Sequence, residues 1–128
     1  MRKAVLCVDD EAILLLAITM SLRNLLPKDV HVDASISAAE AFEAIDELAA
    51  RDIEVGVVVC DLLMPGMKGD DFLRALHAKK PEIKAILLTG FSGSSEEAEL
   101  RRDIGLFASL IKPCNNGDLA RLIKEALG

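Results

Sequence analysis

Aromatic residues are scarce in this chain: they make up 3% of its 128 residues, and Trp and Tyr are absent. The core must therefore be aliphatic, and binding of single strands by stacking bases on aromatic rings is disfavoured. Excess positive charge is also missing, since the net charge is −6, which argues against direct nucleic-acid binding. Such a chain instead favours a cation or a partner with a basic surface.

Long apolar runs are absent as well. No segment reaches the roughly 18 to 20 apolar residues that a membrane span requires. The apolar stretch that follows Arg2 and Lys3 ends at Asp9, before it reaches the roughly 7 residues of a minimal signal-peptide core. We therefore expect no membrane contact and a cytoplasmic location.

Cysteine pairs with a CxxC spacing are also missing, and the cysteine count is odd: Cys7, Cys60 and Cys114. We interpret these residues as reduced, small hydrophobic side chains. A redox or metal role is the alternative, because all three flank the candidate site in sequence. The nucleotide-binding pattern GxxxxGK does not occur either, so a P-loop site is not supported.

The chain does contain 52% apolar residues, enough for a core, and its length predicts one domain over residues 1–128. Its pattern alternates strand and helix five times. Strands are expected at 4–8, 30–34, 55–60, 85–88 and 107–111. Helices are expected at 12–26, 37–50, 69–78 and 95–103, and after a cap at Asn115 or Asn116.

This alternation predicts an α/β fold: a single flavodoxin-like (βα)5 domain with helices on both faces of a parallel sheet. Residues 30–34 alternate polar and apolar positions as an edge strand does, whereas 55–60 contain no polar position and should be central. Right-handed crossovers and these two placements favour the strand order 2-1-3-4-5.

Polar side chains follow four of these strands directly: Asp9 and Asp10, then Asp61, Thr89 and Lys112. The carboxyl ends of parallel strands meet at one edge, where open α/β proteins place their sites. Alone, each residue has a structural interpretation, as a helix cap, a turn residue, a strand end or a solvated charge. Together, three carboxylates, a hydroxyl and an ammonium suit one divalent cation and one phosphoryl group.

The chemistry of these groups is specific. Mg²⁺ prefers oxygen ligands, and Asp9, Asp10 and Asp61 supply carboxylates that would otherwise repel one another; Mn²⁺ is an alternative occupant. A carboxylate can also attack phosphorus to form an aspartyl-phosphate. Lys112 and the cation would neutralise charge on the phosphoryl oxygens, and the Thr89 hydroxyl would donate to one of them.

Four segments carry a family resemblance: Val8-Asp9-Asp10-Glu11, Asp61-Leu62-Leu63-Met64-Pro65-Gly66-Met67-Lys68-Gly69, Leu87-Leu88-Thr89-Gly90 and Lys112-Pro113. Through them essentially the whole chain resembles the response-regulator receiver domains of two-component signalling. The resemblance implies that Asp61 is the phosphoacceptor and that Asp9 and Asp10 hold Mg²⁺ with the backbone carbonyl of Leu63.

The resemblance also implies that Thr89 reorients on phosphorylation, that Lys112 binds the phosphoryl group and that the Lys112-Pro113 bond is cis. The donor would be a histidine kinase or a His-phosphotransfer domain. The output would be an unknown downstream protein or a fused output domain. We expect a signalling phosphoacceptor with limited self-phosphorylation and self-dephosphorylation chemistry, rather than an enzyme.

The chain departs from the family pattern at several positions. Ser109 stands where the family usually has Tyr or Phe, and the aromatic Phe107 lies one pair earlier on the expected strand. Leu63 and Phe91 are apolar where related receivers often have polar groups, which predicts slow self-dephosphorylation. The stretch 12–18 is more apolar than one buried face requires, so it is either deeply packed or a docking surface for the phosphodonor.

Two other functions remain as alternatives. A phosphate-independent binding module with the same fold is favoured by Ser109, although the intact acids, Thr89 and Lys112 argue against it. A Mg²⁺-dependent aspartyl phosphatase usually has a second acid two residues after its nucleophile, and here Leu63 occupies that position.

Overall fold

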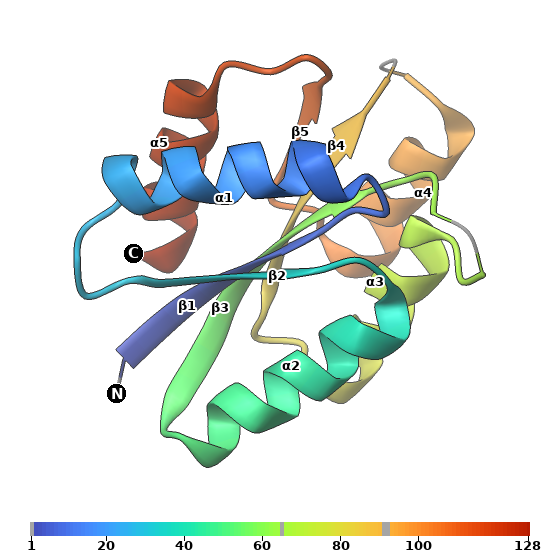
Figure 1. Cartoon of the computed structure of the whole chain (residues 1–128). Helices are drawn as coiled ribbons and strands as arrows, with labels where there is room; N and C mark the ends of the chain where they lie inside the picture. The colour runs from blue at the N-terminus through green and yellow to red at the C-terminus, as the bar shows by residue number, and fades with distance from the viewer. Residues whose placement is uncertain (1, 65, 91–92) are drawn as a thin grey trace.

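Parallel strands form one sheet in the computed structural model, which describes residues 2–64, 66–90 and 93–128 (Figure 1). The sheet has five strands within these residues, in the order β2-β1-β3-β4-β5, as the sequence predicted. β3 lies at the centre because it has no exposed position, and β2 lies at an edge with half-buried residues. The strands are β1 (Arg2–Val8), β2 (His31–Ser35), β3 (Ile53–Asp61), β4 (Lys84–Thr89) and β5 (Ala108–Ile111).

Helices cover both faces of the sheet, which confirms the predicted layers. They are α1 (Ala12–Leu25), α2 (Ala38–Ala50), α3 (Gly69–Lys79), α4 (Ser95–Ile104) and α5 (Asn116–Leu127). α1 and α5 pack on one face, and α2, α3 and α4 pack on the other (Figure 1). No helix in the described ranges is both long enough and apolar enough to cross a membrane.

The core consists of two aliphatic layers, because successive residues of a strand point to opposite faces. In β1, Leu6 packs in the layer under α2 and α3, whereas Val5 and Cys7 pack in the layer under α1 and α5. The one described aromatic pair joins Phe42 to the fully buried Phe72, with ring centroids 5.1 Å apart in an edge-to-face arrangement. Apart from this pair, the buried core of the described residues is aliphatic, as the scarcity of aromatic residues predicted.

A bulge in β3 explains how this buried strand keeps its pairing with β1. Ala4 pairs with Val55 and the next residue, Val5, pairs with Val57, so Gly56 is the extra residue of the bulge. A Cβ atom at Gly56 would lie 2.8 Å from the Leu127 side chain, which shows how closely the end of α5 approaches the sheet.

The first helix is only partly packed. Leu15 and Ile18 are buried against the sheet, but Ile13 is 87% exposed and Leu16 is 58% exposed. Deep packing of the whole stretch 12–18 is therefore wrong for Ile13 and Leu16. The reason is geometric, since a helix on the surface of a sheet buries one stripe, here Leu15, Ile18 and Leu22, and residues on the other side of the helix face outward.

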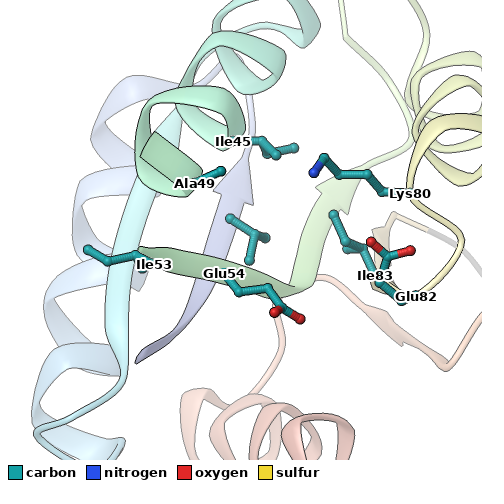
Figure 2. Close-up of a pocket in the computed structure, with 8 residues that line it drawn as sticks. Ile45, Ala49, Ile53, Glu54, Lys80, Glu82 and Ile83 are labelled. Carbon is teal, nitrogen blue, oxygen red and sulfur yellow. The ribbon is translucent and has the colours of Figure 1, made fainter. Parts of the chain in front are cut away.

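The amino-terminal edge of the sheet carries a small hollow of about 170 Å³ between α2 and the segment that joins α3 to β4 (Figure 2). Ile45 and Ala49 from α2 and Ile53 from β3 form aliphatic walls, and the Lys80 ammonium lies on the opposite side. This hollow is at the start of β3, whereas Asp61 is at its end. It therefore takes no part in the candidate site.

Candidate functional site

The polar residues predicted to converge do so at the carboxyl edge of the sheet. Asp9 directly follows β1, Asp61 ends β3, Thr89 ends β4 and Lys112 follows β5. Backbone hydrogen bonds hold this edge together: the Lys112 N–H donates to the Thr89 carbonyl at 2.7 Å, and the Asp9 N–H donates to the Ser35 carbonyl at 3.1 Å. The ends of these four strands thus meet at one edge of the sheet.

Three carboxylates form the centre of the site. Asp9, Asp10 and Asp61 each offer an oxygen, and these oxygens lie within 4.8 Å of one another. Asp9 and Asp61 are buried, whereas Asp10 is exposed, so the cluster opens to solvent on the Asp10 side. Converging carboxylate oxygens with solvent access are the donor set that Mg²⁺ takes in proteins, together with waters and phosphate oxygens. The residues present therefore fit a divalent cation.

The Lys112 ammonium bridges two of these acids. Its Nζ lies 3.2 Å from Asp9 Oδ2 and 3.0 Å from Asp61 Oδ2. Partial burial alone would lower the pKa of Lys112, but hydrogen bonds and charge from Asp61 and Asp9 outweigh burial and raise that pKa. The lysine is therefore a fixed positive charge beside the Asp61 carboxylate.

Backbone donors orient the same two acids. Asp9 Oδ1 accepts a hydrogen bond from the Glu11 N–H at 3.0 Å, and Asp61 Oδ1 accepts one from the Leu63 N–H at 3.4 Å. The helix-cap interpretation of Asp9 is therefore wrong: Glu11 is the N-cap of α1 and no side chain in the described ranges caps this helix, whereas Asp9 closes a turn just before it. The other oxygen of each acid faces Lys112, so both carboxylates also belong to the site.

Gly69 has a positional role that the sequence motif did not reveal. A Cβ atom there would lie 2.9 Å from Leu62 Cα and 3.0 Å from the Asp61 carbonyl carbon, and it would also clash with the Asp61 carbonyl oxygen. The Gly69 N–H donates to the Leu62 carbonyl at 3.0 Å. The start of α3 is thus pressed against the backbone of Asp61, which only glycine allows. A Gly at the expected start of a helix was the available signal.

Ser109 has a partner that sequence reasoning missed. Arg101 Nη2, on α4, donates to Ser109 Oγ at 2.8 Å, and Arg101 Nε lies 4.0 Å from Glu97 Oε2. Ser109 pairs with Leu87 in the sheet, two residues before Thr89. No local pattern joins Arg101 to Ser109, because the contact exists only once α4 packs beside β5. Phe107, expected on this strand, immediately precedes it instead.

The cysteines are free thiols in apolar surroundings. Burial raises the pKa of the Cys7 thiol to about 12 and raises that of Cys60 as well. Cys114 is half-buried, and burial also raises its pKa. These environments agree with the interpretation of the cysteines as small hydrophobic residues.

The Lys112-Pro113 bond is cis, as the resemblance implied. The expectation placed on Phe91 lies outside the described residues, and so does Pro65 of the second motif segment. Leu63 is described, and its side chain is 69% exposed at the mouth of the site.

Comparisons with known proteins agree with this geometry. Residues 5–124 match the family described as the response regulator receiver domain. The chain is 36% identical over 124 residues to the sensor kinase CckA of Brucella abortus, covering 96% of this chain but 12% of the kinase. It is 29% identical over 126 residues to the hydrogenase transcriptional regulatory protein HoxA of Cupriavidus necator, covering 98% of this chain and 24% of that protein. The chain thus spans a minor part of both relatives.

Solved structures give the same result. A response regulator receiver domain protein from Clostridium thermocellum superposes with a TM-score of 0.81 at 30% identity, covering 98% of this chain and 94% of that chain. A CheY-like receiver domain protein from Methanospirillum hungatei superposes with a TM-score of 0.82 at 28% identity, covering 99% and 94%. With an acidic pocket at the expected edge of the sheet, this chain belongs to the response-regulator receiver domains of two-component systems.

Proposed function

We propose that this chain is a phosphoacceptor in which Asp61 takes a phosphoryl group from a histidine of a histidine kinase or His-phosphotransfer domain. The observation that carries the proposal is the placement of Asp61 among Asp9, Asp10 and Lys112 at one edge of the sheet. We also propose that residues 1–128 form one domain and that the output lies in another protein or in a fused domain.

In the transfer, a carboxylate oxygen of Asp61 attacks phosphorus while the phosphorus–nitrogen bond to the donor histidine breaks. The donor imidazole leaves with the bonding electron pair and takes up a proton. Lys112 already lies 3.0 Å from Asp61 Oδ2, so its ammonium is in place to balance charge on the phosphoryl oxygens. Thr89 ends the neighbouring strand, and its hydroxyl would donate to one of those oxygens.

Asp9, Asp10 and Asp61 would hold Mg²⁺ or Mn²⁺, with the backbone carbonyl of Leu63 as a further ligand. The ion, when bound, neutralises charge on the phosphoryl oxygens. The receiver is then a signalling component whose own residues promote both transfer and hydrolysis, rather than an enzyme acting on a separate substrate.

The decisive experiment is intact-mass analysis after incubation with Mg²⁺ and acetyl phosphate. The native chain should gain one phosphoryl group, and Asp61→Asn should gain none. Asp46→Asn is a matched control, because Asp46 is an exposed acid on α2 away from the site, and it should be modified normally. If neither acetyl phosphate nor a cognate kinase modifies the native chain, the phosphate-independent binding module becomes the better description.

We propose that the exposed apolar ridge of α1 receives the phosphodonor. Ile13, Leu16 and Met20 recur at helical spacing on one side of α1 and are each more than half exposed. Ile13 lies next to the site, since α1 starts directly after the Asp9–Glu11 segment. Leu16→Ser should slow phosphotransfer from a protein donor but leave modification by acetyl phosphate unchanged. Leu25→Ser, at the far end of α1, is the control, and an equal effect of both variants would contradict this docking role.

The missing aromatic residue requires another route for the switch. We propose that phosphorylation is transmitted through α4, where Arg101 ties Ser109 to Glu97. Arg101→Ala should uncouple α4 from β5, so amide resonances of α4 would change little on phosphorylation although Asp61 is still modified. Unchanged phosphorylation-dependent shifts in Arg101→Ala would exclude this route.

We propose that the aspartyl-phosphate is long-lived, because the apolar Leu63 at the mouth of the site offers no polar group to orient an attacking water. The decay of the phosphorylated mass in Mg²⁺ buffer measures this directly. A half-life of seconds at neutral pH would contradict it.

A further inference from the structure

Several arginines of this acidic chain lack an acidic partner. Arg74, Arg101, Arg102 and Arg121 all form ion pairs with carboxylates. Arg2, Arg23 and Arg51 form none with any carboxylate in the described residues, although acids outnumber basic residues by 21 to 15. These three guanidinium charges are therefore not neutralised by a carboxylate within the described residues.

All three arginines act electrostatically on one residue, His31, at the start of β2, and Arg2 and Arg23 line a groove with it. Burial lowers the pKa of His31, Arg2, Arg51 and Arg23 lower it further, and only Asp33 opposes them. Three cations from β1, α1 and the end of α2 are thus close enough to act on one imidazole. β1 begins at Arg2 and β2 begins at His31, so both residues lie at the amino-terminal edge of the sheet, opposite to the edge where the aspartates lie (Figure 1).

A groove of about 320 Å³ lies at this edge, and we call it the arginine groove. The residues that line it are Arg2, Arg23, Pro27, Lys28, Val30, His31 and Val32. Three cationic side chains and an imidazole therefore face one space, and no carboxylate is among the described residues that line it. The backbone carbonyl of the nearby Asp29 accepts a hydrogen bond from Arg2 Nε, and Asp33 Oδ1 accepts one from the Ala34 N–H.

The two guanidinium groups of the groove are held in place while most of their donors remain available. Arg2 Nε donates to the Asp29 carbonyl at 3.1 Å, and Arg23 Nη2 donates to the Val32 carbonyl at 3.1 Å. Each group keeps further N–H donors, in the planar geometry that binds phosphate oxygens in pairs. Lys28 is exposed and makes no hydrogen bond or ion pair in the described part of the chain.

We propose that the arginine groove binds a compact anion with two phosphoryl groups, held by Arg2, Arg23 and Lys28. A single phosphoryl group would use only part of this donor set. A long polyanion such as nucleic acid would be repelled by the net charge of −6, so a small anion fits better. The site is separate from Asp61 and does not depend on the phosphoacceptor function.

Calorimetric titration of the whole chain with pyrophosphate in buffer without Mg²⁺ and phosphate tests this. Pyrophosphate should bind, and orthophosphate should bind about tenfold more weakly because it engages fewer charge-assisted hydrogen bonds. ADP is a second probe: affinity equal to that of pyrophosphate would indicate a nucleotide as the source of the diphosphate, and weaker binding would indicate a free diphosphate. No binding of pyrophosphate would overturn the proposal.

Variants locate the binding. Arg23→Gln and Lys28→Gln should each weaken pyrophosphate binding by about tenfold, the loss expected for one charge-assisted contact. Lys28→Gln removes no bond within the described residues, so it remains informative if Arg23→Gln destabilises the fold. Arg121→Gln removes an arginine that is paired with Asp118 and Glu125, and it should change affinity by less than about twofold. Equal losses in all three variants would show general charge attraction and overturn the proposal.

The two histidines give a position-specific readout by NMR. A bound anion should raise the pKa of His31, because it offsets the positive charges of Arg2, Arg51 and Arg23 that act on the imidazole and adds to the attraction of Asp33. His77, on α3, is the internal reference, and its resonances should not shift. A shift of His77 without one of His31 would place the anion elsewhere and refute the assignment.

Discussion

Replacement of Gly69 by alanine is the sharpest structural test of how this chain positions its phosphoacceptor. The added Cβ would lie 2.9 Å from Leu62 Cα and 3.0 Å from the Asp61 carbonyl carbon, and closer still to the Asp61 carbonyl oxygen. All three neighbours are backbone atoms, so no side-chain rotation relieves the overlap. The start of α3 and the end of β3 must instead separate by an amount on the order of 1 Å, given the close packing of protein interiors.

Two opposing effects determine the loss of unfolding free energy in Gly69→Ala. Overpacking of this kind typically costs about 1–3 kcal/mol. Alanine recovers up to about 1 kcal/mol over glycine in a helix, but less at this first helical position. We therefore expect Gly69→Ala to lose about 2 kcal/mol of unfolding free energy, which lowers Tm by roughly 5 to 12 °C for a chain of this length.

Asp61 should move with its carbonyl, so phosphorylation should suffer as well. A misplacement on the order of 1 Å can slow a positioned reaction by about a hundredfold. Circular dichroism melting measures the first effect, and intact mass after acetyl phosphate measures the second. Gly90→Ala is the matched control, because a Cβ there meets nothing within 4 Å, and it should leave both values unchanged. A Gly69→Ala protein with native Tm and native phosphorylation would refute this reasoning.

Three further predictions concern the labelling of the cysteines, the pH dependence of stability and the binding of Mg²⁺. Brief iodoacetamide treatment should label Cys114 before Cys7 and Cys60, because burial raises the pKa of Cys7 to about 12 and Cys60 is also fully buried; equal labelling in peptide mass spectra would contradict this. Burial and neighbouring arginines lower the pKa of His31 from 6.5, so the folded state should lose stability as pH falls from 6.5 through that lower pKa, and His31→Gln should flatten this slope in urea titrations. Excess Mg²⁺ should raise Tm, because the ion binds only the folded acid cluster, and Asp10→Asn should reduce that rise; an unchanged native Tm would argue against the metal site.

The strand ends were accessible to sequence reasoning because their signals are local. An apolar run followed at once by Asp61 or Lys112 places that residue at the carboxyl end of a strand, and parallel pairing then brings such ends together. The edge position of β2 and the central position of β3 could also be predicted, because the order of polar and apolar residues along a strand indicates how much of it faces solvent.

Contacts between segments that are far apart in the sequence could not be predicted from it. The partner of Ser109 is Arg101, and that pair forms only when α4 packs beside β5. The exposure of Ile13 depends on the rotation of α1 about its own axis as it packs on the sheet. The apolar composition of this helix could not show that Ile13 is exposed while Leu15 is buried. Both facts belong to packing between elements rather than to any one element.

Taken by itself, the sequence determined the fold class, the strand order and the set of residues at the candidate site, because hydrophobic period and strand-end chemistry are properties of short segments. Tertiary structure alone decided that Lys112 bridges Asp9 and Asp61, that Gly69 presses against the Asp61 backbone, and that Arg2 and Arg23 line one groove with His31. The physical reason is that these contacts depend on distances between elements far apart in the chain, and those distances are set only when the helices pack on the sheet.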